Sequence, residues 1–136
     1  KGYNSDFTRT VFVHSITDEF RRIYNIVRYA QETAIQSVRP GVNMGTLDSR
    51  ARDVITQEGY GDFFGHSLGH GVGMEVHELP AVKSGGSVKL KKNTVITIEP
   101  GIYLPGKGGV RIEDMVCVTS KGVEVMTGSP KDIIIV

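Results

Sequence analysis

The sequence predicts an α+β domain in which two helices pack on a mostly antiparallel sheet. Two amphipathic segments with helical spacing lie in the first half of the chain, and short apolar segments joined by turn residues fill the second half. Helices and strands gathered in separate parts of a chain favour this class over an alternating α/β arrangement. The 136 residues are enough for one compact domain.

The composition excludes several classes of protein. The net charge is +1 and the basic residues are spread along the chain, so we predict neither a nucleic-acid partner nor a membrane partner. No apolar run approaches the roughly 18 residues of a membrane span. The single cysteine, Cys117, excludes an internal disulfide, and its apolar neighbours predict a buried, unreactive thiol. We expect a cytoplasmic protein.

The chain begins with one expected strand and one long helix. Residues 7–13 alternate and are rich in Thr, Val and Phe, which predicts a strand. Thr17 is the expected N-cap, because two acidic residues follow it in the first turn. Pro40 and Gly41 end the helix. Its apolar positions recur every three to four residues, at Phe20, Ile23, Ile26, Val27, Ala30, Ala34 and Val38.

A second helix is expected over residues 47–58, with Gly59 as the residue that follows its C-cap. The glycines at 69, 71 and 73 then argue against another helix, and residues 74–77 are compatible with a strand. The remaining strands are expected over residues 94–99, 110–118 and 123–126. Turns or loops are expected over residues 84–87, 105–109 and 120–122.

Three of the four histidines lie in a single glycine-rich stretch, as His66, His70 and His77. Imidazole is the commonest metal ligand and the usual proton shuttle near neutral pH. Glycine lets the backbone approach a bound group closely. A phosphate-binding loop would follow a strand and open a helix, whereas this stretch leads into Met-Glu-Val-His. The pattern therefore predicts a metal or catalytic site.

Three carboxylates on separate strands are candidates to converge on these histidines, namely Asp6, Glu99 and Glu113. Arg111 and Glu113 share one face of their expected strand, because side chains alternate along it. One imidazole with several carboxylates suits Mn, Co, Zn or Fe. Taken singly, each acid is more often a surface charge, and spacing alone leaves a core or cation–π role for Arg111 open.

Four stretches together resemble the pita-bread metallopeptidases, in particular their Xaa-Pro aminopeptidase and prolidase branch. These stretches are residues 2–10, residues 66–73 with 77–80, residues 97–103 and residues 109–114. They span nearly the whole chain. The last two contain the motifs Pro-Gly-Ile-Tyr and Gly-Val-Arg-Ile-Glu-Asp. Methionine aminopeptidases usually lack these two motifs.

The resemblance implies a pita-bread fold with a dinuclear metal site. It implies that Asp6 and Glu113 bridge two divalent metal ions and that His70 and Glu99 complete one of them. Manganese is the expected metal, with cobalt or zinc as alternatives. Glu99 would also shuttle protons for a nucleophilic water activated as a metal-bound hydroxide.

The resemblance also implies a reaction. His66 and His77 would contact the substrate and stabilise the tetrahedral intermediate, and Arg111 would hold the carboxylates of the cleft. The substrate would be a peptide with proline at the second position, cleaved before that proline by an Xaa-Pro aminopeptidase or Xaa-Pro dipeptidase. A non-catalytic pita-bread binding module and a methionine aminopeptidase are the alternatives.

The sequence departs from the family pattern at its N-terminal side. The family's first metal-binding aspartate lies eleven residues before the second, which places it ahead of Lys1. We therefore expect residues 1–136 to be the C-terminal half of the catalytic domain, without the upstream half and the N-terminal domain, and inactive alone. The upstream half is then an expected partner, and a homodimer is a candidate assembly. Asn93 stands where relatives often have Gly, with little expected effect, because Asn tolerates left-handed geometry.

Overall fold

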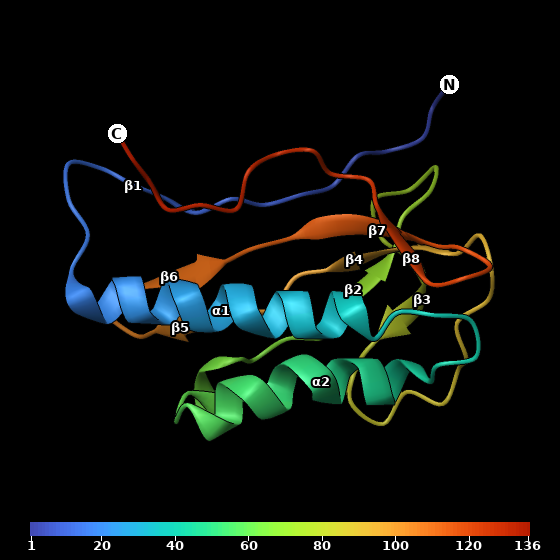
Figure 1. Ribbon diagram of the computed structural model, residues 1–136, viewed down its shortest axis with the longest axis horizontal. Coiled ribbons are helices and arrows are strands. Elements are labelled where there is room, and N and C mark those ends of the chain that lie inside the picture. The colour runs from blue at the N-terminus through green and yellow to red at the C-terminus, as the bar shows by residue number, and fades with distance from the viewer.

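The computed structural model describes all of residues 1–136 and contains two long helices beside a mostly antiparallel sheet (Figure 1). Helix α1 (Asp18–Gln36) and helix α2 (Met44–Gln57) lie side by side. The N-terminal and C-terminal segments run next to each other, along the top of the view in Figure 1. The predicted α+β arrangement is confirmed.

Helix α1 begins where the sequence predicts. The side chain of Thr17 accepts a hydrogen bond from the amide of Phe20, which satisfies one of the free amides of the first turn. The buried face of the helix contains Ile23, Val27 and Ala30, as the spacing predicts.

Helix α2 begins at Met44, earlier than the predicted residue 47. Asn43 is its N-cap, and its side-chain oxygen accepts from the amide of Gly45 at 2.8 Å. Because Asn is a strong N-cap residue, the earlier start has a local cause. Gly59 has a φ of +86°, which confirms its predicted place beyond the helix end.

The main sheet has five strands in the order β3-β2-β4-β7-β8, and all its pairings are antiparallel. β5 pairs with β6 in a separate hairpin, and β1 pairs with β9 in parallel. A short 3₁₀ turn covers Gly61–Phe63. The strands are β1 (Val11–Phe12), β2 (Gly69–Gly71), β3 (Glu78–Val82), β4 (Val95–Ile98), β5 (Gly101–Leu104), β6 (Gly108–Arg111), β7 (Asp114–Val118), β8 (Val123–Val125) and β9 (Ile134–Ile135).

Two predicted strands differ in the structure. The strand predicted over residues 7–13 is reduced to β1 and a bridge between Thr8 and Glu113. The strand predicted over residues 110–118 is split, because β6 pairs with β5 whereas β7 pairs with β4. The chain changes sheets between Arg111 and Asp114, and Glu113 lies at this change. Residues 74–77 form bends, and the strand begins after them.

The core lies between the helices and the main sheet and includes Val27, Leu47 and Ile96, all fully buried. Gly69 is required where β2 meets β4, since a Cβ atom there would lie 2.0 Å from the carbonyl oxygen of Thr97. Cys117 is partly exposed, so its predicted full burial is wrong; it lies on β7, next to the short strand β8. None of the helices has the length and hydrophobicity needed to cross a membrane.

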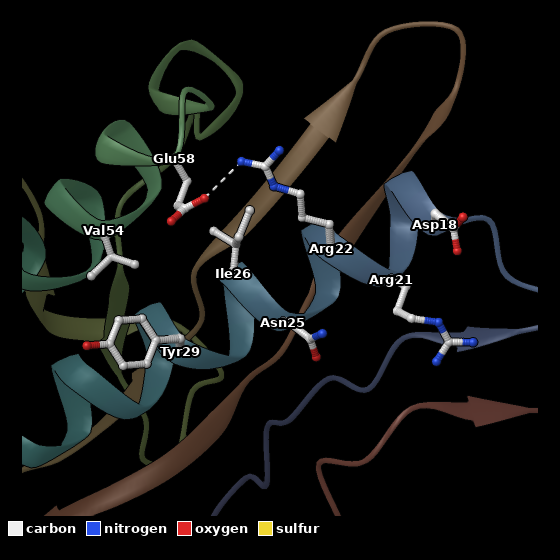
Figure 2. A pocket seen from close by; sticks show the side chains of 8 residues that line it. All are labelled: Asp18, Arg21, Arg22, Asn25, Ile26, Tyr29, Val54 and Glu58. Carbon is white, nitrogen blue, oxygen red and sulfur yellow. Dashed lines mark hydrogen bonds and ion pairs between the residues drawn. The ribbon is translucent and has the colours of Figure 1, made fainter.

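A groove of about 510 Å³ lies between the two helices (Figure 2). Arg22 of α1 and Glu58 form an ion pair of 3.0 Å across it. Ile26, Tyr29 and Val54 contribute its apolar surface. No residue predicted for the metal site lines this groove.

Candidate metal centre

The predicted ligands come from four segments that backbone contacts bring together. His70 lies in β2. The backbone amide of Glu99, at the end of β4, donates a hydrogen bond of 2.8 Å to a backbone carbonyl just before β2. Thr8 and Glu113 exchange backbone hydrogen bonds of 3.1 and 3.4 Å. This bridge places Asp6, two residues before Thr8, in the same region.

His70 is held so that one ring nitrogen faces the carboxylates. Its Nδ1 lies 3.0 Å from the carbonyl oxygen of Gly71, and because a carbonyl can only accept, Nδ1 carries the proton. The opposite nitrogen, Nε2, lies 3.2 Å from Oε1 of Glu99 and 3.6 Å from Oδ2 of Asp6. A neutral His70 therefore directs a lone pair at two acceptor groups.

Acceptors that face one another are held together by a shared proton or by a cation. One ligand atom each from Asp6, His70 and Glu113 lies within 4.8 Å of the other two, and Glu99 adds a fourth acceptor beside His70. Carboxylate oxygens and one imidazole form a donor set suited to divalent first-row metals. The four residues predicted as ligands thus fit a metal ion by their chemistry.

Burial makes the two glutamates costly to ionise without such an ion. Desolvation raises the pKa of Glu99 above its usual value, although the hydroxyl of Thr97 and the charge of Arg111 act in the opposite direction. Desolvation also raises the pKa of Glu113, which is 3% exposed. A bound cation would offset this cost.

Two threonines that the sequence analysis did not select contact these glutamates. The hydroxyl of Thr97 donates to Oε1 of Glu99 at 3.0 Å. The hydroxyl of Thr8 donates to Oε2 of Glu113 at 2.5 Å. Both threonines belong to the motifs that carry the resemblance. The two-residue spacing of Thr97 and Glu99 on one strand could have indicated their contact, whereas nothing near Thr8 indicates its contact with Glu113.

His66 and Arg111 lie around a residue that the predictions missed, Tyr103. The hydroxyl of Tyr103 lies 3.0 Å from Nε2 of His66. Interaction with the same side chain raises the pKa of the Arg111 guanidinium. Tyr103 lies on β5, opposite Gly109 of β6, so the hairpin sets its position beside Arg111.

His77 is solvent-exposed and lies against His70, with 4.2 Å between the ring centroids. It forms no ion pair with the carboxylates of the site. Together with the other predicted catalytic residues it lines a cavity of about 410 Å³, which also includes His66, His70, Glu99 and Arg111. Larger hollows lie elsewhere, between the helices and beside the loop around Gly85.

Comparisons with solved structures confirm the predicted pita-bread fold. The chain superposes on the Xaa-Pro dipeptidase from Bacillus anthracis with a TM-score of 0.97 and 48% identity, over 99% of this chain and 38% of that one. It superposes on the X-Pro aminopeptidase from Thermotoga maritima MSB8 with a TM-score of 0.96 and 47% identity, over the same shares.

Sequence comparison gives the same relatives. The chain is 49% identical to the Xaa-Pro dipeptidase of Pyrococcus furiosus over 132 residues, which cover 97% of this chain and 38% of that protein. The chain therefore spans well under half the length of the curated relatives it matches. Residues 1–120 match metallopeptidase family M24, and the chain belongs to that family.

Proposed function

We propose that the protein containing this chain hydrolyses the bond between an N-terminal residue and a following proline at a dinuclear metal site. The observation that carries the proposal is the orientation of His70, whose Nε2 faces Asp6 and Glu99 while its Nδ1 is held by Gly71. Membership of metallopeptidase family M24 and the names of the relatives support the substrate class.

Asp6, His70, Glu99 and Glu113 would hold the metal ions, with Asp6 and Glu113 shared between two of them. Manganese is the proposed metal, with cobalt or zinc as alternatives for the same donor set. Divalent ions bound there would supply Lewis-acid activation of water.

The remaining roles belong to side chains of this chain. Oε2 of Glu99 accepts no hydrogen bond, so it is available to take a proton from the attacking water and return it to the departing nitrogen. The raised pKa of Glu99, caused by burial, suits an acid–base group. His66, His77 and Arg111 line the cavity and would contact the peptide there.

We propose further that residues 1–136 form the C-terminal half of the catalytic domain, and that the upstream half of the same protein is the partner that completes the site. The 38% share of the relatives' length supports this division. Exposed apolar side chains on the N-terminal segment, Phe7, Val11 and Val13, offer a surface for that partner. A cytoplasmic location and a homodimer stay predictions.

The test is manganese-dependent, chelator-sensitive cleavage by the protein that contains this chain. An X-Pro-Y tripeptide, an X-Pro dipeptide and a Met-Gly-X peptide are compared at equal concentration. Cleavage of the tripeptide supports an aminopeptidase, and preference for the dipeptide supports a dipeptidase. Cleavage of Met-Gly-X alone would indicate a methionine aminopeptidase. Manganese binding without any cleavage would contradict the proposed reaction, and a protein that neither binds manganese nor cleaves would be a non-catalytic module.

A further inference from the structure

We propose that two threonine hydroxyls are the positioning groups of the metal site, each orienting one glutamate ligand. Thr97 holds Glu99, and Thr8 holds Glu113. The inference rests on the proposed metal site and assigns to two further side chains the task of preparing its ligands.

Thr97 connects two ligands of the site. Its Oγ1 accepts the backbone N–H of His70 at 3.1 Å and lies 3.0 Å from Oε1 of Glu99. A hydroxyl has one hydrogen, and an amide N–H can only donate. The amide therefore occupies a lone pair of Oγ1, and the hydroxyl hydrogen is left to point at the carboxylate. Thr97 is fully buried, so no water competes for this bond.

Thr8 repeats this arrangement at the other glutamate. Its Oγ1 accepts from Nε of Arg111 at 3.1 Å and donates to Oε2 of Glu113 at 2.5 Å. A guanidinium can only donate, so the direction of the second bond is again fixed. The short distance is in the range of a charge-assisted O–H···O⁻ bond.

Each glutamate is thus held through one oxygen and leaves the other oxygen without a hydrogen-bond partner. The free atoms are Oε2 of Glu99 and Oε1 of Glu113. A long glutamate side chain loses rotational freedom when it binds an ion. A hydrogen bond from a threonine outside the ligand set restricts the side chain before the ion binds. Outer contacts of this kind typically change metal affinity by about 10–100-fold.

Thr10 provides a matched control on the same segment. Its Oγ1 donates to the carbonyl of Arg111 at 2.9 Å and accepts the amide of Arg111 at 3.1 Å. It therefore makes the same number of hydrogen bonds as Thr8 and reaches no carboxylate. A substitution at Thr10 shows what loss of a threonine hydroxyl does to this segment by itself.

The experiment measures Mn²⁺ affinity by electron paramagnetic resonance of the free ion, in the protein that contains this chain. The variants are Thr8→Val, Thr97→Val, the corresponding Ser variants and Thr10→Val, and the melting temperature of each is measured without metal. We expect both Val substitutions at the ligand-bound threonines to weaken Mn²⁺ binding by about 10–100-fold. Serine, which keeps the hydroxyl, should restore most of the lost affinity. Thr10→Val should bind Mn²⁺ as the unmutated protein does.

Unchanged affinity in both Val variants would overturn the inference while leaving the proposed function intact. Affinity lost equally in the Val and Ser variants, in parallel with the metal-free melting temperature, would assign these threonines a purely structural role. If Thr97→Val does not fold, the Thr8 variants decide between the outcomes. Absence of Mn²⁺ binding in the unmutated protein would overturn the proposed function together with this inference.

Discussion

The phenolic hydroxyl of Tyr103 lies 3.0 Å from Nε2 of His66. Nδ1 of His66 lies 2.8 Å from a backbone carbonyl oxygen, so Nδ1 carries the proton and Nε2 accepts from Tyr103. The backbone carbonyl therefore fixes the tautomer, and Tyr103 fixes the direction of a histidine that lines the cavity.

The first prediction concerns Tyr103→Phe. The substitution removes one hydrogen bond, worth about 1 kcal/mol, so kcat/KM for an X-Pro-Y peptide should fall about five- to tenfold. Mn²⁺ affinity should stay unchanged, because Tyr103 contacts none of the four proposed ligands. Steady-state kinetics and a manganese titration of the same preparation provide the check. A loss of metal affinity equal to the loss of activity would show that Tyr103 supports the ligands instead.

The second prediction separates two neighbouring histidines. His70→Ala removes the imidazole that faces Asp6 and Glu99, so added Mn²⁺ should no longer raise the melting temperature. His77→Ala should keep that rise and lower turnover, since His77 lies against the His70 ring and forms no ion pair with the carboxylates. Thermal melts with and without Mn²⁺ distinguish the two. Equal behaviour of the variants would contradict the division into ligand and substrate contact.

Much of the site was predictable because its ligands lie in motifs with distinctive local chemistry. His70 is surrounded by glycines, and Glu99 precedes a Pro-Gly turn. Tyr103 and Thr8 were not selected, because their partners lie far away in the sequence, where local spacing gives no information. Asn93 has a left-handed φ of +67°, the geometry on which the expectation for Asn in place of Gly rests; the small effect of the replacement stays a prediction.

The strand predictions were wrong where a strand ends because its partner strand changes, while the residue pattern along the chain continues. The stretch from Val110 to Val118 reads as one strand, yet β6 and β7 belong to different sheets. Ile134 and Ile135 pair with β1 at the opposite end of the chain, a contact that no nearby residue indicates. Arg111 and Glu113 do not share a strand, but both reach the same hydroxyl of Thr8.

The third prediction concerns the pH dependence of the metal-free protein. Burial raises the folded-state pKa of Glu99 and Glu113 above the ordinary value of 4.5, so the folded state binds more protons than the unfolded state in that window. Their contribution to stability is therefore present at pH values below 4.5 and is lost as pH rises through the raised pKa values.

Glu99→Gln and Glu113→Gln should accordingly raise the metal-free melting temperature at pH 7 and flatten its decline above pH 4.5. The same variants should lose the stabilisation by Mn²⁺, because the amide removes a charged ligand. Melting curves from pH 4 to pH 8 in a chelator, then in Mn²⁺, test both halves. If the metal-free variants melt at a lower temperature than the unmutated protein at pH 7, burial of the two ionised carboxylates does not destabilise the protein, and the prediction is wrong.

The fourth prediction concerns Asp114, a buried acid next to Glu113 in the sequence. Asp114 pairs with Arg9 at 2.7 Å and with Lys131 at 2.6 Å, and its side chain is 0% exposed. Burial raises the pKa of Asp114, but hydrogen bonds from Lys131, Arg9 and Gln31 outweigh burial and leave the pKa below its usual value. The stability it contributes is therefore present above its unfolded pKa and is lost as pH falls through the lowered one.

Asp114→Asn leaves the charges of Arg9 and Lys131 without their buried partner and should cost about 3–5 kcal/mol of unfolding free energy. Glu58→Gln is the matched control, because Glu58 pairs with Arg22 on the surface, where such a pair contributes about 0–1 kcal/mol. Urea denaturation of both variants at pH 7 gives the comparison. Arg9 also donates to the carbonyl of Glu113 at 2.7 Å, so Asp114→Asn should weaken Mn²⁺ binding as well, whereas Glu58→Gln should not. Equal destabilisation by the two substitutions would mean that the buried network contributes no more than a surface ion pair.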